Sequence, residues 1–160
     1  MKQSELANWL RGLVVVTATV TVVFLLGIVP LILGRLAATH PAEYHYLLQP
    51  GLVFVVVALL PALIALCKVW KICGEIAKNN SFSKTNAGLL RDISRLCLVE
   101  VVIFLGGIVW LFATGHKDIF VLLLLFGFIF LALFIAVLTA ALSHLTEKAS
   151  LLKHENDLTI

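Results

Sequence analysis

The sequence predicts an all-α membrane protein, an antiparallel bundle of four transmembrane helices with both ends of the chain in the cytoplasm. Of its 160 residues, 61% are hydrophobic and only 13% are charged. Soluble domains are typically about 45–50% apolar and about 25% charged. A chain this short buries only about two-thirds of its surface when it folds in water. Lipid must therefore be the solvent for most of it, and the lipid bilayer is its first predicted partner.

Four apolar segments are long enough to cross about 30 Å of hydrocarbon as helices. We place these spans at about residues 10–36, 50–73, 96–112 and 119–142. The first contains the uncharged run Leu13–Leu33. This run exceeds the apolar core of a cleaved signal peptide, which is usually about 7–15 residues, so we expect a retained span. The prolines Pro30 and Pro61 predict bends in the first two spans. Threonines of the first span are expected to bond back to the helix backbone: Thr17, Thr19 and Thr21.

Residues 74–95 form the predicted cytoplasmic loop, the one long polar segment inside the sequence. Asn79 and Asn80 favour the end of the second helix near residue 78, and Ser83 is well placed as the N-cap of a new helix. Apolar residues then recur at helical spacing among charged ones. We therefore expect an amphipathic first turn that lies on the membrane surface and leads directly into the third span.

The distribution of basic residues predicts the orientation. Ten of the 12 Lys and Arg residues lie in the N-terminal segment, in the central loop with its flanks, or after the fourth span. Only Arg35 and Lys117 lie in the other two connections. Because Lys and Arg concentrate on the cytoplasmic side of membrane proteins, the loop and both termini are predicted to be cytoplasmic. Residues 143–160 should then form a cytoplasmic helical tail.

Glu100 is the single carboxylate inside an apolar span. A carboxylate at membrane depth is costly and is usually paired, protonated or functional. If the second span ends near residue 72 and the third begins near residue 96, Lys68 and Glu100 lie at similar depths. We predict that they form an intramembrane ion pair. A solvated carboxylate at the cytoplasmic mouth and a role in transport or switching are the alternatives.

Small residues suggest where the helices pack. In lipid, helices associate through close packing rather than through hydrophobicity. Alanines at four-residue spacing on the fourth span and two glycines on the third predict a packing seam, although alanine is also simply a good helix former. A homo-oligomer is left open. The residues of the predicted seam are Ala132, Ala136, Ala140, Gly106 and Gly107.

No catalytic, cofactor or metal site is predicted. The sequence has no phosphate-binding Gly-rich loop, no HExxH and no nucleophile elbow. His40, Glu43 and His45 are interpreted as residues of a wet loop, because nothing fixes a ligand geometry. The net charge of +3 gives no basic surface of the kind that binds nucleic acid directly. We therefore expect a protein that is not an enzyme.

Two short motifs stand out in the polar segments. The central loop reads FSxxNxxxLRxI, formed by Phe82, Ser83, Asn86, Leu90, Arg91 and Ile93. The chain ends in ENDLTI, with Glu155, Asp157, Leu158, Thr159 and Ile160. Together they resemble motifs of the DUF2975 family of small bacterial membrane proteins, and the likeness extends over essentially the whole chain. Ser94 is a departure, because the family often has Gly after the Ile.

The resemblance implies four spans, a bacterial plasma membrane and no established enzymatic activity. It also implies a partner, because members are often encoded beside a small helix–turn–helix regulator of the Cro/CI type. We therefore favour a regulatory protein that binds a cytoplasmic partner through its central loop and tail. One alternative is a small transporter or channel subunit that uses Glu100. Another is a structural or stress-related membrane protein without a ligand.

Overall fold

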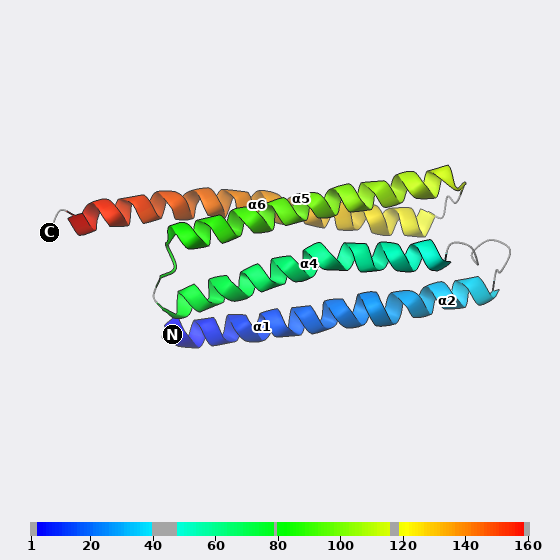
Figure 1. Ribbon diagram of the computed structural model, residues 1–160, viewed down its shortest axis with the longest axis horizontal. Coiled ribbons are helices and arrows are strands. Elements are labelled where there is room, and N and C mark those ends of the chain that lie inside the picture. The colour runs from blue at the N-terminus through cyan, green and yellow to red at the C-terminus, as the bar shows by residue number, and fades with distance from the viewer. Residues whose placement is uncertain (1–2, 40–47, 79, 116–118, 159–160) are drawn as a thin grey trace.

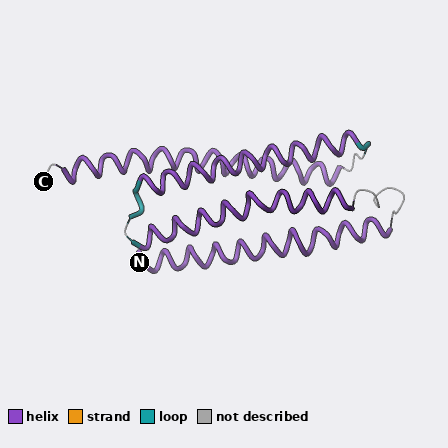
Figure 2. Tube along the Cα trace, in the orientation of Figure 1, coloured by secondary structure: helices purple, strands orange, loops and turns teal. Residues whose placement is uncertain are grey.

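The computed structural model describes residues 3–39, 48–78, 80–115 and 119–158. The described chain consists of long helices joined by short connections (Figure 1 and Figure 2). The first rod continues from one helix through a π-helical turn into a second, and three uninterrupted helices follow. In order they are α1 (Gln3–Val23), η1 (Phe24–Ile28), α2 (Val29–Thr39), α4 (Leu48–Ala77), α5 (Lys84–Ala113) and α6 (Ile119–Leu158).

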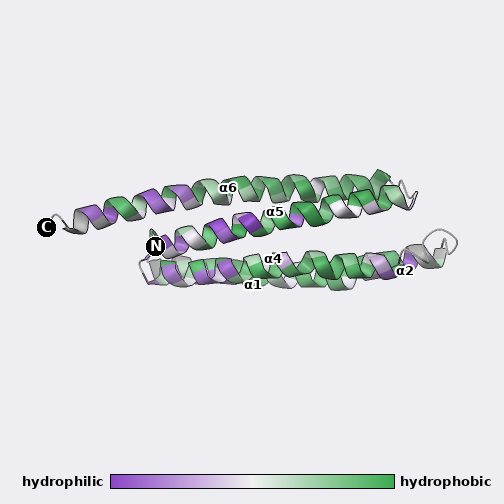
Figure 3. Ribbon diagram, turned by 45° about the horizontal axis from the view of Figure 1, so that its top comes forward, coloured by the Kyte–Doolittle hydropathy of each residue, from purple (hydrophilic) through white to green (hydrophobic). Residues whose placement is uncertain are grey.

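Each of the four described rods contains a stretch long and apolar enough to cross a membrane: Ala7–Arg35, Leu48–Ala77, Lys84–Ala113 and Ile119–Lys153. The predicted all-α, four-span architecture is therefore confirmed. Hydrophilic residues gather toward one end of the rods, where the N-terminus, the α4–α5 connection and the last turns of α6 lie (Figure 3). We call this end the polar end.

Helices that are neighbours in the sequence are neighbours in space. The first rod packs on α4, α4 packs on α5, and α5 packs on α6 (Figure 1). Successive rods run in opposite directions, which gives the antiparallel order expected from short connections. The α5–α6 contact is the most extensive of the three.

Local chemistry explains two features of the first rod. Thr17, Thr19 and Thr21 donate hydrogen bonds to backbone carbonyls four residues earlier, at 2.8–2.9 Å, as predicted. The π-helical turn η1 ends at Ile28, two residues before Pro30. Proline has no N–H for the carbonyl four residues back, so the regular ladder is interrupted there. Pro61, in contrast, lies inside the continuous helix α4.

The core follows α5 along its length. Toward the polar end, Ile93 and Cys97 of α5 are buried with Ala136 of α6, and residues of α4 pack against them. Toward the opposite end, Ile108 of α5 is buried with residues of α6 in a second cluster. Aromatic rings fill the space between the three helices, with Phe104 stacked on Phe128 at 5.5 Å and tilted against Phe54 at 6.2 Å.

The helix end predicted near residue 78 and the helix predicted to follow Ser83 are both confirmed. Most of the expected loop 74–95 belongs to helices, because α4 continues to Ala77 and α5 begins at Lys84. The first turns of α5 continue without interruption into its apolar part. They therefore lead directly into the third span, as predicted. The tail continues α6 to Leu158, and Thr159 and Ile160 lie outside the described residues.

Candidate functional site

The connection between α4 and α5 is closed by its own side chains. Ser83 has the extended backbone of an N-cap, and its Oγ accepts a hydrogen bond from the N–H of Asn86 at 3.2 Å. The predicted cap is therefore confirmed. Asn86 reaches back, and its Nδ2 donates to the carbonyls of Asn80 at 3.2 Å and Ser81 at 2.9 Å. These bonds satisfy carbonyl groups that a short loop leaves without partners.

The end of α4 is tied to the same loop. The backbone N–H of Asn80 donates to the carbonyl of Glu75 at 3.0 Å, and Asn80 Nδ2 donates to Glu75 Oε2 at 2.9 Å. Lys78 Nζ lies 3.4 Å from the other carboxylate oxygen. Asn86 itself is only 2% exposed, and its Oδ1 is buried without a partner among the described residues. The loop is thus a compact, internally bonded unit.

The structure divides the predicted loop motif into inward and outward residues. Ser83, Asn86 and Ile93 point inward, where they cap, bond and pack. Phe82 is 61% exposed. Arg91 is also exposed, and its guanidinium forms an ion pair with Glu147 of α6 at 2.7 Å. Leu90 is half-buried. Phe82 and Arg91 are therefore the exposed residues of the motif.

Polar side chains also join α5 to α6, and sequence reasoning missed them. Ser94 Oγ donates to the carbonyl of Ala136 at 2.9 Å, and Ser143 Oγ donates to the carbonyl of Ala87 at 2.7 Å. Both serines are buried. The sequence contained only a weak indication of these bonds. Each serine is a small polar residue within a helical segment, and serines in such segments often form hydrogen bonds between helices in lipid.

Lys68 and Glu100, predicted to pair, are not brought together. Lys68 Nζ instead bonds Asp92 Oδ2 at 2.8 Å. The reason is the register set by the short loop. Because α5 begins at Lys84, Asp92 already lies level with Lys68. Glu100 lies eight residues further along α5, about 12 Å at 1.5 Å per residue.

The Lys68–Asp92 pair lies in the polar turns outside the apolar part of the bundle. Its side chains are 29% and 41% exposed. The hydrogen bond from Lys68 lowers the pKa of Asp92, and the nearby positive charges of Lys68, Arg95 and Arg91 act in the same direction. Asp92 is therefore held as a carboxylate that joins α5 to α4 at the polar end.

Arg11 joins the first rod to α4 at the same end. Its guanidinium carbon lies 5.5 Å from the centre of the Trp70 ring, a cation–π geometry. A Cβ placed on Gly74 would lie 3.6 Å from an Arg11 nitrogen, so the side chain passes close to the α4 backbone. The Nε of Arg11 is buried and has no hydrogen-bond partner among the described residues.

The predicted packing residues separate into two groups. Ala132 and Ala136 are buried, at 8% and 2% exposure. Gly107 is buried, and a Cβ added to it would lie 2.7 Å from the Phe54 ring. Ala140 and Gly106 are exposed, and a Cβ on Gly106 would meet nothing within 4 Å. Three of the five predicted positions thus lie in contacts between helices.

The tail motif is described only in part. Glu155 is exposed on α6. Asp157 and Leu158 belong to the last turn of α6, with side chains outside the description. Thr159 and Ile160 lie outside the described residues. The structure therefore places the start of this motif on a helix that continues from the fourth span.

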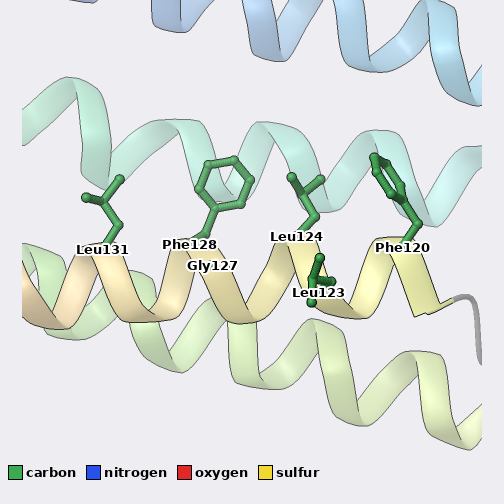
Figure 4. A pocket seen from close by; sticks show the side chains of 6 residues that line it. All are labelled: Phe120, Leu123, Leu124, Gly127, Phe128 and Leu131. Carbon is green, nitrogen blue, oxygen red and sulfur yellow. The ribbon is translucent and has the colours of Figure 1, made fainter.

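An apolar hollow of about 310 Å³ lies along α6 near its start. Phe120, Leu124, Phe128 and Leu131 rise from α6 toward α4 around it (Figure 4). All the side chains that line it are apolar, so it offers no groups for acid–base chemistry. Among the residues described, no group of three or more His, Cys, Asp or Glu is arranged to hold a metal ion.

Four long apolar rods with one polar end define a multi-pass integral membrane protein. Comparison with known protein families identifies the family to which the chain belongs. The model of the DUF2975 family, a protein family of unknown function, matches residues 31–160. The chain therefore belongs to the DUF2975 family.

A curated relative agrees with this assignment. The uncharacterized membrane protein YoaS of Bacillus subtilis (strain 168) is 30% identical over 111 residues, which cover 68% of this chain and 69% of that protein. No solved structure matches the chain.

Proposed function

We propose that the protein is a regulatory membrane protein without catalytic activity, which lies in a bacterial plasma membrane and binds a cytoplasmic partner through its polar end. The 10-to-2 distribution of Lys and Arg supports a cytoplasmic polar end, because basic residues concentrate on that side. The loop motif and the tail both lie there, so a partner can reach both at once.

The projection of α6 carries this proposal. Spanning about 30 Å of hydrocarbon requires about 20 helical residues, whereas α6 has 40. Ser143 lies level with Ala87, so three further residues bring α6 level with Lys84, where α5 begins. From about Glu147 onward α6 extends past the rest of the bundle (Figure 1).

The last turns of α6, from just before the end of the bundle onward, expose apolar side chains. Leu145 is 61% exposed, Leu151 46% and Leu152 66%. Leu145 and Leu152 are seven residues apart and therefore share one face of the helix. An apolar stripe on a helix in water is the typical surface for docking in a partner's groove. Glu147 lies on the other side of α6, where it bonds Arg91 of α5, so the stripe formed by Leu145 and Leu152 is turned away from that contact.

The resemblance to a family often encoded beside a Cro/CI-type helix–turn–helix regulator names the first partner to test. The full-length protein in detergent micelles would be used to capture the purified regulator encoded nearby. The variant Leu145→Ser/Leu152→Ser should reduce capture at least tenfold. The control Leu123→Ser/Phe130→Ser changes exposed residues of the same helix at its opposite end and should leave capture unchanged.

Equal capture by wild type and the Leu145/Leu152 variant would overturn the proposed contact surface. No capture of the regulator by the wild-type protein would overturn the regulator as the partner.

A further inference from the structure

Glu100 lies in the seam between α5 and α4. Its neighbours at helical spacing on α5 all face α4 or the core: Cys97 is buried with α4 residues packed on its cluster, Phe104 contacts Phe54, and Gly107 lies against the same ring. Glu100 falls three residues after Cys97 and four before Phe104, so it shares this face. Its side chain is half-buried and has no hydrogen-bond or ion-pair partner among the described residues.

The register places Glu100 opposite Pro61. Counting eight residues from the Lys68–Asp92 bond, backward on α4 and forward on α5, pairs Glu100 with Leu60. The Phe54–Gly107 contact gives nearly the same result: seven residues forward on α4 and seven backward on α5 pair Glu100 with Pro61. Pro61 is buried. It lies seven residues from both Phe54 and Lys68, which contact α5, so it shares the face of α4 that is directed toward α5.

Pro61 leaves a backbone acceptor free in this layer. Proline has no N–H, so the carbonyl of Val57, four residues earlier, lacks its usual helical donor. A helical carbonyl points along the axis toward the residue four ahead. The free carbonyl of Val57 therefore opens beside Pro61, at the level of Glu100.

We propose that Glu100 is a proton-binding site, in which the protonated carboxyl group donates a hydrogen bond to the carbonyl of Val57. An ionised carboxylate in apolar surroundings is costly, and so is a backbone carbonyl without a donor at membrane depth. A single proton on Glu100 resolves both. Release of that proton removes the bond and places a charge in the α4–α5 seam, so the site makes the packing of these helices respond to pH.

Other ionisable groups around the site are few. On α4, residues 48–66 contain no ionisable side chain, Cys67 is exposed, and Lys68 is held by Asp92 about 12 Å toward the polar end. On α6, residues 119–143 contain none, and His144 follows. On α5 the nearest is the buried thiol of Cys97, one turn away. The first rod packs on α4, its residues 12–34 contain no charged side chain, and Arg11 lies toward the polar end, over Trp70.

This proposal is independent of the contact with a partner, and infrared spectroscopy tests it directly. The full-length protein in phosphatidylcholine vesicles should show a carboxylic-acid C=O band at pH 7 that Glu100→Gln removes completely. Glu147→Gln, at the polar end, is the matched control and should leave the band unchanged. If Glu100→Gln instead removes a carboxylate band and leaves the acid region unchanged, Glu100 is ionised in the wild type, and the proposed proton-binding site is overturned.

Pro61→Ala tests the hydrogen bond itself. Alanine restores an N–H for the carbonyl of Val57 and is the better helix former, so the variant should fold. Glu100 then loses its acceptor, and its acid band should move to higher frequency while Glu147→Gln leaves it in place. An acid band that Glu100→Gln removes but that Pro61→Ala does not shift would overturn the assignment of Val57 as the acceptor.

Discussion

The first rod and the α5–α6 hairpin are similarly apolar but are attached to the molecule in different ways. None of the most apolar stretch of the first rod is buried. Its threonines bond within their own helix. In contrast, α5 and α6 bury residues of both helices, and two serines donate across their interface. The family match begins at residue 31, so it leaves out most of this rod and includes the whole hairpin.

The difference shows that apolar composition does not determine which helices associate. Lipid chains are as apolar as the side chains, so packing and polar bonds must supply the attraction. The hairpin has small residues at close contacts, such as Ala136, with carbonyls that accept from serine. The first rod has branched residues facing outward and one cation–π contact, from Arg11. We therefore treat α4, α5 and α6 as the structural unit and the first rod as its lateral partner.

Adding one carbon to Gly107, in the three-helix unit, should show the contrast most strongly. Gly107→Ala places a Cβ 2.7 Å from the Phe54 ring, and that ring is already packed on Phe104. Overpacking of this kind costs about 1–3 kcal/mol. We expect a loss of this size in the free energy of unfolding, measured by titration with a denaturing detergent in mixed micelles.

Two other glycines act as controls. A Cβ on Gly51 approaches only the flexible end of Leu33 in the first rod, at 3.3 Å, and one on Gly106 meets nothing within 4 Å. Both changes should be neutral or should stabilise by up to about 1 kcal/mol, because glycine is the poorer helix former. Equal losses at Gly51 and Gly107 would mean that the first rod packs as tightly as the three-helix unit.

The polar bonds across the hairpin should contribute a smaller effect. Ser94→Ala/Ser143→Ala removes two donors to backbone carbonyls of the neighbouring helix. Such bonds average about 0.6 kcal/mol each in a membrane, so we expect a loss of about 1 kcal/mol in the same unfolding titration. The matched change in the first rod, Thr17→Ala/Thr19→Ala, removes only bonds within one helix and should alter the free energy by less than about 0.5 kcal/mol.

A loss in the threonine variant that equals the loss in the serine variant would contradict the comparison. It would mean that the first rod depends on its polar groups as strongly as the hairpin does.

The number of spans and the cap of α5 followed from the sequence because each depends on local composition. A run of apolar residues predicts a span wherever it packs, and Ser83 caps the helix that follows it directly. The Asn86 bonds to the loop carbonyls were not predicted, since the motif alone does not show which way an amide turns. Ala140 and Gly106 were assigned to the seam only from spacing, which does not reveal where the neighbouring helix lies.

The partner of Lys68 depended on register, which composition does not fix. Span ends placed near residues 72 and 96 align Lys68 with Glu100. The polar turns that extend both helices to Ala77 and Lys84 align it with Asp92 instead. Polar residues at the end of a span are compatible with either a loop or a helix, and the difference of a few turns changes every contact between α4 and α5.

The smallest expected effect comes from the Lys68–Asp92 pair, which joins α4 to α5 through partly exposed groups. Asp92→Asn should cost about 0.2–1 kcal/mol at pH 7, the range of exposed ion pairs. Because Lys68 lowers the pKa of Asp92, the pair stabilises the fold above the unfolded carboxyl pKa of about 3.9. Its contribution is lost as the pH falls through the lower pKa of the folded state.

The difference in free energy of unfolding between wild type and Asp92→Asn should therefore shrink as the pH is lowered below about 4. In a Lys68→Gln background Asp92→Asn should have little further effect, whereas an undiminished loss there would show that Asp92 acts through Arg91 and Arg95.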